Sequence, residues 1–166
     1  MCIVLDVNVI PLIFSVEAES HDQFKPLLTW ITNDVGKIVY GGEKYKQELS
    51  KLRKYLKLFS QLKKAGKAIE IDGDQVDQYQ EELEEQVSHR DFDDPHLIAI
   101  IIVSRCRLIA TAEKRAIPFF KDSKFYPSGV KKPKIYTGIR NVGLLTRRNV
   151  ANICLPISKQ LVALVI

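Results

Sequence analysis

Four acidic residues occupy positions where they could perform metal-dependent chemistry. Asp6 closes an apolar run in LDVNVI, and Glu48 follows the next apolar run in GGEKYKQEL. Asp94 opens an apolar segment in DFDDPHLIAIII, and Glu113 lies just past another apolar run in IATAEKR. Oxygen ligands without a cysteine or histidine cluster favour Mg²⁺ or Mn²⁺ over Zn²⁺. Ions held in this way activate water and neutralise the charge of a phosphodiester.

Taken singly, these carboxylates have ordinary structural explanations. Asp6 is typical of a helix N-cap, and Asp94, followed by a proline, is typical of a helix start. Glu48 by itself is typical of a surface glutamate that pairs with Lys44 or Lys51. The argument for a shared site therefore depends on their occurrence together.

The negative charges crowded around Asp94 favour a bound cation. Asp91 and Asp93 stand beside Asp94, and like charges at the mouth of an apolar helix cost free energy unless a cation neutralises them. His96 lies one turn into that helix and is a candidate ligand or proton carrier, although a hydrogen-bonded histidine at a helix start is the commoner use of this residue. The polar residues expected to support the four carboxylates are Asn8, Asp93 and Thr111, and Thr111 is expected to orient the Glu113 side chain.

Short apolar runs alternate with longer segments of helical spacing, which predicts the elements that position these residues. The predicted strands cover residues 3–6, 36–40, 68–71, 107–111 and 134–137. The predicted helices cover residues 21–32, 45–66 with a glycine as the stop, 72–89 and 94–105. This alternation predicts one domain over residues 1–166, an α/β/α sandwich with a mostly parallel sheet. Functional groups in such sheets gather beyond the carboxyl ends of the strands.

The distribution of charge favours a polyanionic partner. The chain has 25 Lys and Arg against 20 Asp and Glu, for a formal net charge of +5. Residues 42–67 hold nine basic and two acidic side chains, residues 70–94 one and eleven, and residues 105–148 twelve and two. Basic segments are typical of nucleic-acid-binding proteins, although a solvated helix face is the alternative for residues 44–67. The candidate RNA contacts are Lys44, Lys51, Lys54, Lys114 and Arg115.

The three cysteines and the apolar runs favour a cytoplasmic protein. Cys2, Cys106 and Cys154 form an odd number without CxxC spacing, which predicts reduced and buried thiols. The longest apolar runs, at residues 97–103 and 161–166, are much shorter than the ~20 residues that span a bilayer. We therefore expect no membrane segment and no targeting peptide. The C-terminal run QLVALVI is expected to form a final strand, a helix or a dimer contact.

The order of the acidic motifs resembles the PIN domain, a family of metal-dependent ribonucleases. The resemblance rests on Asp6-x-Asn8, Glu48 after the second strand, DDPHLIAI at the start of an apolar helix, and Thr111-x-Glu113 after a strand, and it covers nearly the whole chain. It implies a five-stranded parallel sheet whose four carboxylates bind one or two Mg²⁺ or Mn²⁺ ions and cleave single-stranded RNA. Such domains occur as toxins of toxin–antitoxin pairs, as RNA-processing nucleases and in stand-alone form, so the partners to expect include an antitoxin or a homodimer partner.

Two positions depart from the family pattern. Val7 stands where the family usually has threonine, and Glu113 stands where it usually has aspartate. Two functions therefore remain open, a metal-dependent endoribonuclease and a PIN-like RNA-binding or scaffold module with weakened catalysis. A nucleotide-binding or phosphotransfer protein is a third possibility, but the chain has neither GxGxxG nor a P-loop motif. If Glu113 points away from the other carboxylates, the second function gains support.

Overall fold

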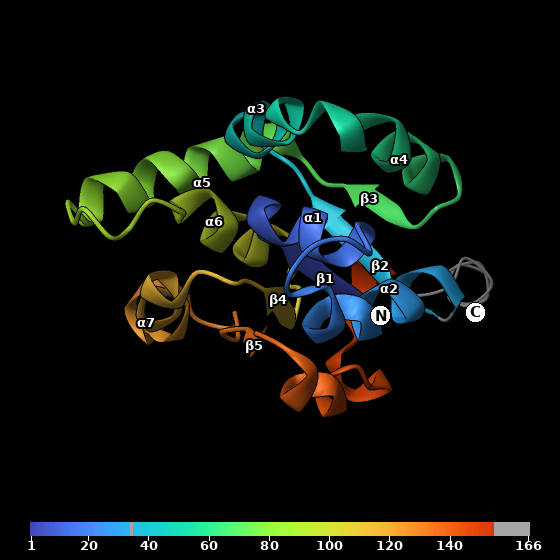
Figure 1. Ribbon diagram of the computed structural model, residues 1–166. Coiled ribbons are helices and arrows are strands. Elements are labelled where there is room, and N and C mark those ends of the chain that lie inside the picture. Colours follow the sequence, from blue (N-terminus) through green and yellow to red (C-terminus); the bar gives the residue numbers. More distant parts are fainter. Residues whose placement is uncertain (34, 155–166) are drawn as a thin grey trace, which may run out of the picture.

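A parallel sheet forms the centre of the fold. The computed structural model describes residues 1–33 and 35–154. Its strands are β1 (Cys2–Leu5), β2 (Lys37–Tyr40), β3 (Ala68–Glu70), β4 (Leu108–Ala110) and β5 (Lys134–Tyr136). They pair in parallel in the order β3-β2-β1-β4-β5, with helices on both faces (Figure 1). The predicted α/β/α sandwich and the five predicted strands are confirmed.

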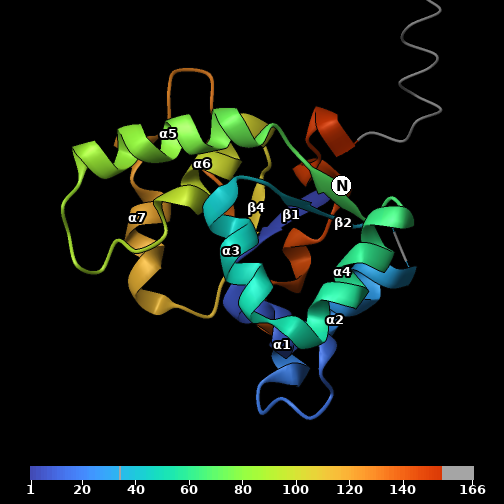
Figure 2. The same ribbon diagram turned by 90° about the horizontal axis from the view of Figure 1, so that it is seen from above.

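The helices form two layers around the sheet. They are α1 (Ile10–Phe14), α2 (His21–Asn33), α3 (Glu43–Lys51), α4 (Arg53–Lys64), α5 (Gly73–Gln86), α6 (Pro95–Ser104) and α7 (Ile117–Lys121). Figure 2 shows α1, α2 and α4 on one side of the sheet and α5, α6 and α7 on the other. Because the chain crosses from one face to the other between β3 and β4, the strand order reverses between β1 and β4.

The single helix predicted over residues 45–66 is two helices, so that prediction was wrong in one respect. Leu52 has φ −90° and ψ 56°, and it separates α3 from α4. The apolar spacing continues through the break, since Leu49 on α3 and Tyr55 on α4 are both buried and Leu52 packs against the core. The break lets each short helix pack its apolar side against the sheet. The periodic spacing of apolar residues along the sequence does not reveal such a break.

Helix α6 is the most deeply buried helix of the described chain, as its apolar sequence predicts. Every residue in it except Val103 is buried, and it packs against α5 and the strands β1 and β2. Full burial of each of its isoleucines contributes roughly 1.5–3 kcal/mol relative to exposure. The helix begins at the carboxyl edge of the sheet and ends at the amino edge, so it fixes Asp94 on the same edge as the residue after β1.

The prediction of three reduced thiols was wrong. A disulfide joins Cys2 to Cys154, 152 residues apart in the sequence, while Cys106 is a free and buried thiol. Spacing gave no sign of this pair, because the two residues meet only after the chain has completed the sheet. Disulfides persist chiefly in oxidising compartments, so the cysteines no longer support a cytoplasmic location.

Within residues 1–33 and 35–154, no helix is long and apolar enough to cross a membrane. The chain after β5 forms three short 3₁₀ helices, η4 (Ile139–Leu144), η5 (Arg147–Asn149) and η6 (Asn152–Cys154). The C-terminal run at residues 160–166, for which a strand, a helix or a dimer contact was predicted, lies outside the described residues.

Candidate functional site

Asp6 lies at the point where the strand order reverses. It directly follows β1, and its side chain is nearly completely buried. The backbone N–H of Asn8 donates to Oδ1 at 3.1 Å, and the hydroxyl of Thr111, which follows β4, donates to Oδ2 at 2.8 Å. Burial raises the pKa of Asp6, and these two hydrogen bonds partly oppose the rise. Crevices at such reversals are where open parallel sheets bind ligands.

Thr111 orients a different carboxylate from the one expected. Its hydroxyl donates to Asp6 and accepts only the backbone N–H of Glu113, at 3.0 Å. The prediction that Thr111 steadies the Glu113 side chain was therefore wrong. The hydroxyl of Thr111, just after β4, instead holds Asp6, at a site where the buried Val7 has no hydroxyl.

Helix α3 carries Glu48 to the same edge of the sheet. Tyr45 anchors this helix, because its buried hydroxyl donates to the carbonyl of Leu5 at 2.9 Å. Oε1 of Glu48 lies 3.6 Å from Nζ of Lys44, and Oε2 lies 3.2 Å from Nε2 of His96. Burial acts to raise the pKa of Glu48, but the contacts with His96 and Lys44 outweigh it and lower that pKa.

The surroundings of His96 differ from those expected from the sequence. It lies on the first turn of α6 with 1% of its surface exposed, and the ring of Tyr45 packs against it. Its Nε2 is within ion-pair distance of Glu48 without the alignment of a hydrogen bond, and Nδ1 has no hydrogen-bond partner among the described residues. It is therefore not the hydrogen-bonded histidine that was expected, and only the packing of α3 against α6 reveals its contact with Glu48.

Asp94 caps α6 by position but not by hydrogen bonding. It is the N-cap residue of α6, yet its side chain accepts no capping bond. Burial, followed by the charge of Asp6, raises the pKa of Asp94 to about 6; Glu48 and Asp93 act in the same direction, and His96 opposes them. The ionised Asp94 carboxylate is therefore destabilised by burial and by neighbouring charges, and it makes no capping hydrogen bond that would stabilise the helix.

A pocket of about 380 Å³ collects most of these side chains. Its lining residues are Asn8, Lys44, Glu48, Asp91, Asp93, Asp94, Glu113 and Arg115. The buried Asp6 interacts electrostatically with both Glu48 and Asp94. The predicted residues thus meet in one region, although no group of three or more histidine, cysteine or acidic residues within the described chain lies close enough to share an ion.

Glu113 is directed toward Arg115. Its Oε1 accepts from the backbone N–H and the Nε of Arg115, at 3.2 and 3.1 Å, and Oε2 accepts from Nη2 at 3.3 Å. This pairing lowers the pKa of Glu113. Nη1 of the same arginine lies 3.9 Å from Asp91, so a guanidinium stands between two acidic residues of the pocket.

The predicted RNA contacts divide into two groups. Lys44 and Arg115 line the carboxylate pocket, and Lys114 lines a second pocket of about 460 Å³ together with residues that follow β4 and β5. Lys51 and Lys54 line neither pocket, and the amine of Lys54 lies 5.7 Å from the centroid of the adjacent Tyr55 ring.

Comparison with protein-family models, with curated proteins and with solved structures finds no match to this chain. The case for a function therefore depends on the residues and the geometry described above.

Removing the charge of Asp94 is expected to stabilise the metal-free protein above pH 6. Its pKa is about 6 in the folded state against 3.8 ordinarily, so the folded state resists ionisation and loses stability as the pH rises through this window. In EDTA at pH 7.5, Asp94→Asn should exceed the wild type by about 1–3 kcal/mol in free energy of unfolding, and the gain should vanish at pH 3.5.

Urea unfolding at the two pH values measures this difference. Asp93→Asn is the matched comparison, because Asp93 is exposed and contributes least among the named groups that raise the pKa of Asp94, so its gain should be smaller. An Asp94→Asn gain of the same size at both pH values would contradict the electrostatic explanation.

Proposed function

We propose that the protein is a Mg²⁺- or Mn²⁺-dependent endoribonuclease that hydrolyses phosphodiester bonds of single-stranded RNA. The observation that carries the proposal is the gathering of Asp6, Glu48 and Asp94 at the reversal of strand order, with the pKa of Asp94 raised to about 6. Ionised carboxylates that lie close together repel one another, and a bound cation would remove this repulsion. Their oxygen-only donor set fits a hard divalent ion.

Each residue has a distinct part in this proposal. Asp6, Glu48 and Asp94 would hold the ion after their side chains move closer together, and Glu113 would join them when released from Arg115. Such an ion neutralises phosphodiester charge and makes water a stronger nucleophile. Thr111 fixes the orientation of the Asp6 carboxylate through its hydroxyl.

A second candidate function is a PIN-like RNA-binding or scaffold module with weak catalysis. The pairing of Glu113 with Arg115 favours it, because this carboxylate is engaged by a side chain of the protein itself. For an endoribonuclease, the resemblance to PIN domains suggests the toxin of a toxin–antitoxin pair, with an antitoxin or a second copy of the chain as its partner.

A cleavage panel distinguishes the two functions. A labelled circular single-stranded RNA, a linear RNA and a DNA of the same sequence are incubated with the protein in Mn²⁺, Mg²⁺ or EDTA. Cleavage of the circular RNA that depends on the metal supports an endoribonuclease, because a circle offers no end to an exonuclease. RNA binding without cleavage supports the binding module, and neither binding nor cleavage contradicts both.

Replacing Arg115 with glutamine is expected to increase divalent-ion affinity by roughly three- to tenfold. The change removes a positive charge from the pocket and frees Glu113, and a factor of ten corresponds to ~1.4 kcal/mol, within the range of one charge interaction near a protein surface. Mn²⁺ titration without RNA measures the effect. The control is Arg90→Gln, because Arg90 is almost fully exposed and lies 4.0 Å from Asp91. An unchanged or weaker affinity in Arg115→Gln would contradict this role.

RNA affinity is expected to depend on salt through the lysines that line the two pockets. For single strands the slope of log affinity against log salt is about −0.7 per phosphate neutralised. In an Asp94→Asn background, Lys44→Gln and Lys114→Gln should each reduce the steepness of this slope by roughly 0.7. Lys51→Gln and Lys54→Gln are the matched controls. An equal effect of all four changes would show that a position in one of the pockets does not determine which lysines contact the RNA.

A further inference from the structure

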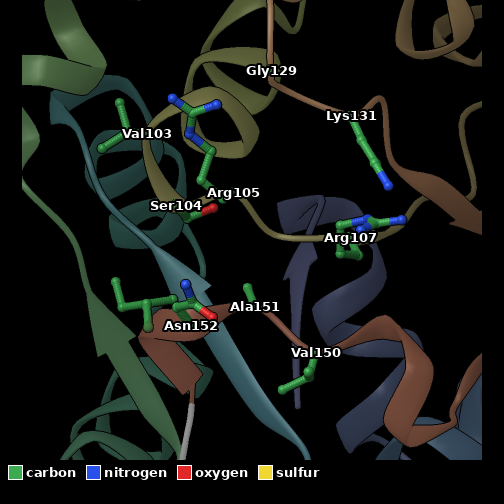
Figure 3. Close-up of a pocket in the computed structure, with 10 residues that line it drawn as sticks. Val103, Ser104, Arg105, Arg107, Gly129, Lys131, Val150, Ala151 and Asn152 are labelled. Atoms are coloured by element: carbon green, nitrogen blue, oxygen red, sulfur yellow. The ribbon is translucent and has the colours of Figure 1, made fainter. Parts of the chain in front are cut away.

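A cavity of about 500 Å³ lies at the opposite edge of the sheet from the carboxylates (Figure 3). Its walls come from the end of α6, the chain before β4, the loop before β5 and residues 150–153. Helix α6 separates the two regions, since Asp94 precedes its first residue and Arg105 follows its last. Ten helical residues span about 15 Å, so this cavity is not part of the carboxylate site.

The cavity is lined by three cations and by no acidic residue. Arg105, Arg107 and Lys131 carry these charges, and within residues 1–33 and 35–154 none of the three has an acidic partner. Figure 3 shows the amine of Lys131 and the guanidinium of Arg107 pointing toward each other, while Arg105 extends away from them. Two cations that converge in this way repel each other, and an anion between them would remove the repulsion.

Backbone pairing joins the two segments that carry the converging cations. The carbonyl of Arg107 accepts the N–H of Lys134 at 2.8 Å, and Leu108 pairs with Lys134 in the sheet. The segments that carry Arg107 and Lys131 are thus joined by the β4–β5 pairing. The wall formed by residues 150–153 directly precedes Cys154, which the disulfide attaches to the first residue of β1.

We propose that this cavity binds a phosphate monoester. Near neutral pH a monoester carries a charge between −1.5 and −2 and three acceptor oxygens, as phosphorylated side chains do. Two converging cations match that charge better than the single charge of a phosphodiester. The apolar walls, which include Val103, Val150 and Ile153, would contact the organic part of the ligand. The monoester could be a free nucleotide or the 5′-terminal phosphate of an RNA.

Isothermal titration of the wild-type protein in EDTA tests the proposal. The probes are AMP, adenosine, 3′,5′-cyclic AMP and inorganic phosphate. We expect AMP to bind more tightly than inorganic phosphate, and adenosine and the cyclic diester to bind at least tenfold more weakly than AMP. Equal affinity for AMP and adenosine, or no AMP binding at millimolar concentration, would overturn the proposal.

Charge variants identify the cavity as the binding site. Arg107→Gln and Lys131→Gln should each weaken AMP binding at least tenfold, and Arg105→Gln should weaken it less. Lys131→Arg should retain binding, which separates loss of charge from loss of folding. Lys25→Gln is the control for net charge, because this exposed lysine lines none of the described pockets. Unchanged AMP affinity in both Arg107→Gln and Lys131→Gln would place the ligand elsewhere and overturn the proposal.

Two short RNAs that differ only in a 5′ phosphate distinguish the sources of the monoester. Displacement of AMP by the phosphorylated RNA at a lower concentration than by the unphosphorylated RNA would identify an RNA end as the ligand, and no displacement of AMP by either RNA would identify a free nucleotide. Both outcomes support a monoester site. If the two RNAs bind equally and both compete with AMP, the site recognises backbone diesters and the proposal fails.

Discussion

Asp6→Asn is expected to lower RNA cleavage by at least about 10²-fold, the loss typical of removing one electrostatic group from an active site. Both oxygens of Asp6 are already held, by the N–H of Asn8 and the hydroxyl of Thr111. Asparagine keeps the size of the side chain but removes the charge that would hold a cation. Because burial opposes that charge in the folded protein, the variant should fold at least as stably as the wild type in EDTA.

The measurement is the cleavage rate of a labelled single-stranded RNA in Mn²⁺, with RNA affinity determined separately in EDTA. Glu70→Gln is the matched control, because Glu70 ends β3 at the same edge of the sheet but pairs with Lys46 and Lys63 outside the pocket. The control should cleave at the wild-type rate. Wild-type cleavage by Asp6→Asn would contradict the assignment of the site.

Loss of the disulfide is expected to lower the free energy of unfolding by about 3–5 kcal/mol, because cross-linking distant residues restricts the unfolded chain. Cys2 and Cys154 are 152 residues apart, so the closed loop includes nearly the whole described chain. For a protein of this size the change corresponds to a fall of roughly 6 to 20 °C in Tm.

Thermal unfolding with and without dithiothreitol measures this effect. Thiol titration in denaturant should find one thiol before reduction and three after it, since Cys106 alone is free. Cys106→Ala is the control and should remain sensitive to the reductant. Three thiols before reduction, together with an unchanged Tm, would contradict the pairing of Cys2 with Cys154.

The sequence predicts the positions of the strands well because strand formation here follows local apolar runs. All five predicted strands overlap the observed ones, and the apolar segment after Asp94 forms the buried α6. Parallel pairing then follows from the crossover helices, and it carries Asp6 and Asp94 to one edge of the sheet. The placement of Asp6 and Asp94 can therefore be predicted from the order of strands and helices, without knowledge of side-chain contacts.

The features that the sequence missed depend on tertiary contacts or on competing partners. The contact of His96 with Glu48 requires the packing of α6 against α3, which no spacing along the chain encodes. Glu113 had two available partners, the other carboxylates through a shared ion and Arg115 two residues away. The short loop favours the local arginine, because the charged hydrogen bonds form without any tertiary rearrangement.

Direct titration of the metal-free protein with Mn²⁺ at pH 7.5, followed by the electron paramagnetic resonance signal of the free ion, tests the central claim most directly. One or two ions should bind saturably and be displaced by Mg²⁺. Asp6→Asn and Asp94→Asn should each bind Mn²⁺ at least tenfold more weakly, with Glu70→Gln unchanged. The absence of saturable binding, or wild-type affinity in Asp6→Asn, would contradict a divalent-ion site at the reversal of strand order.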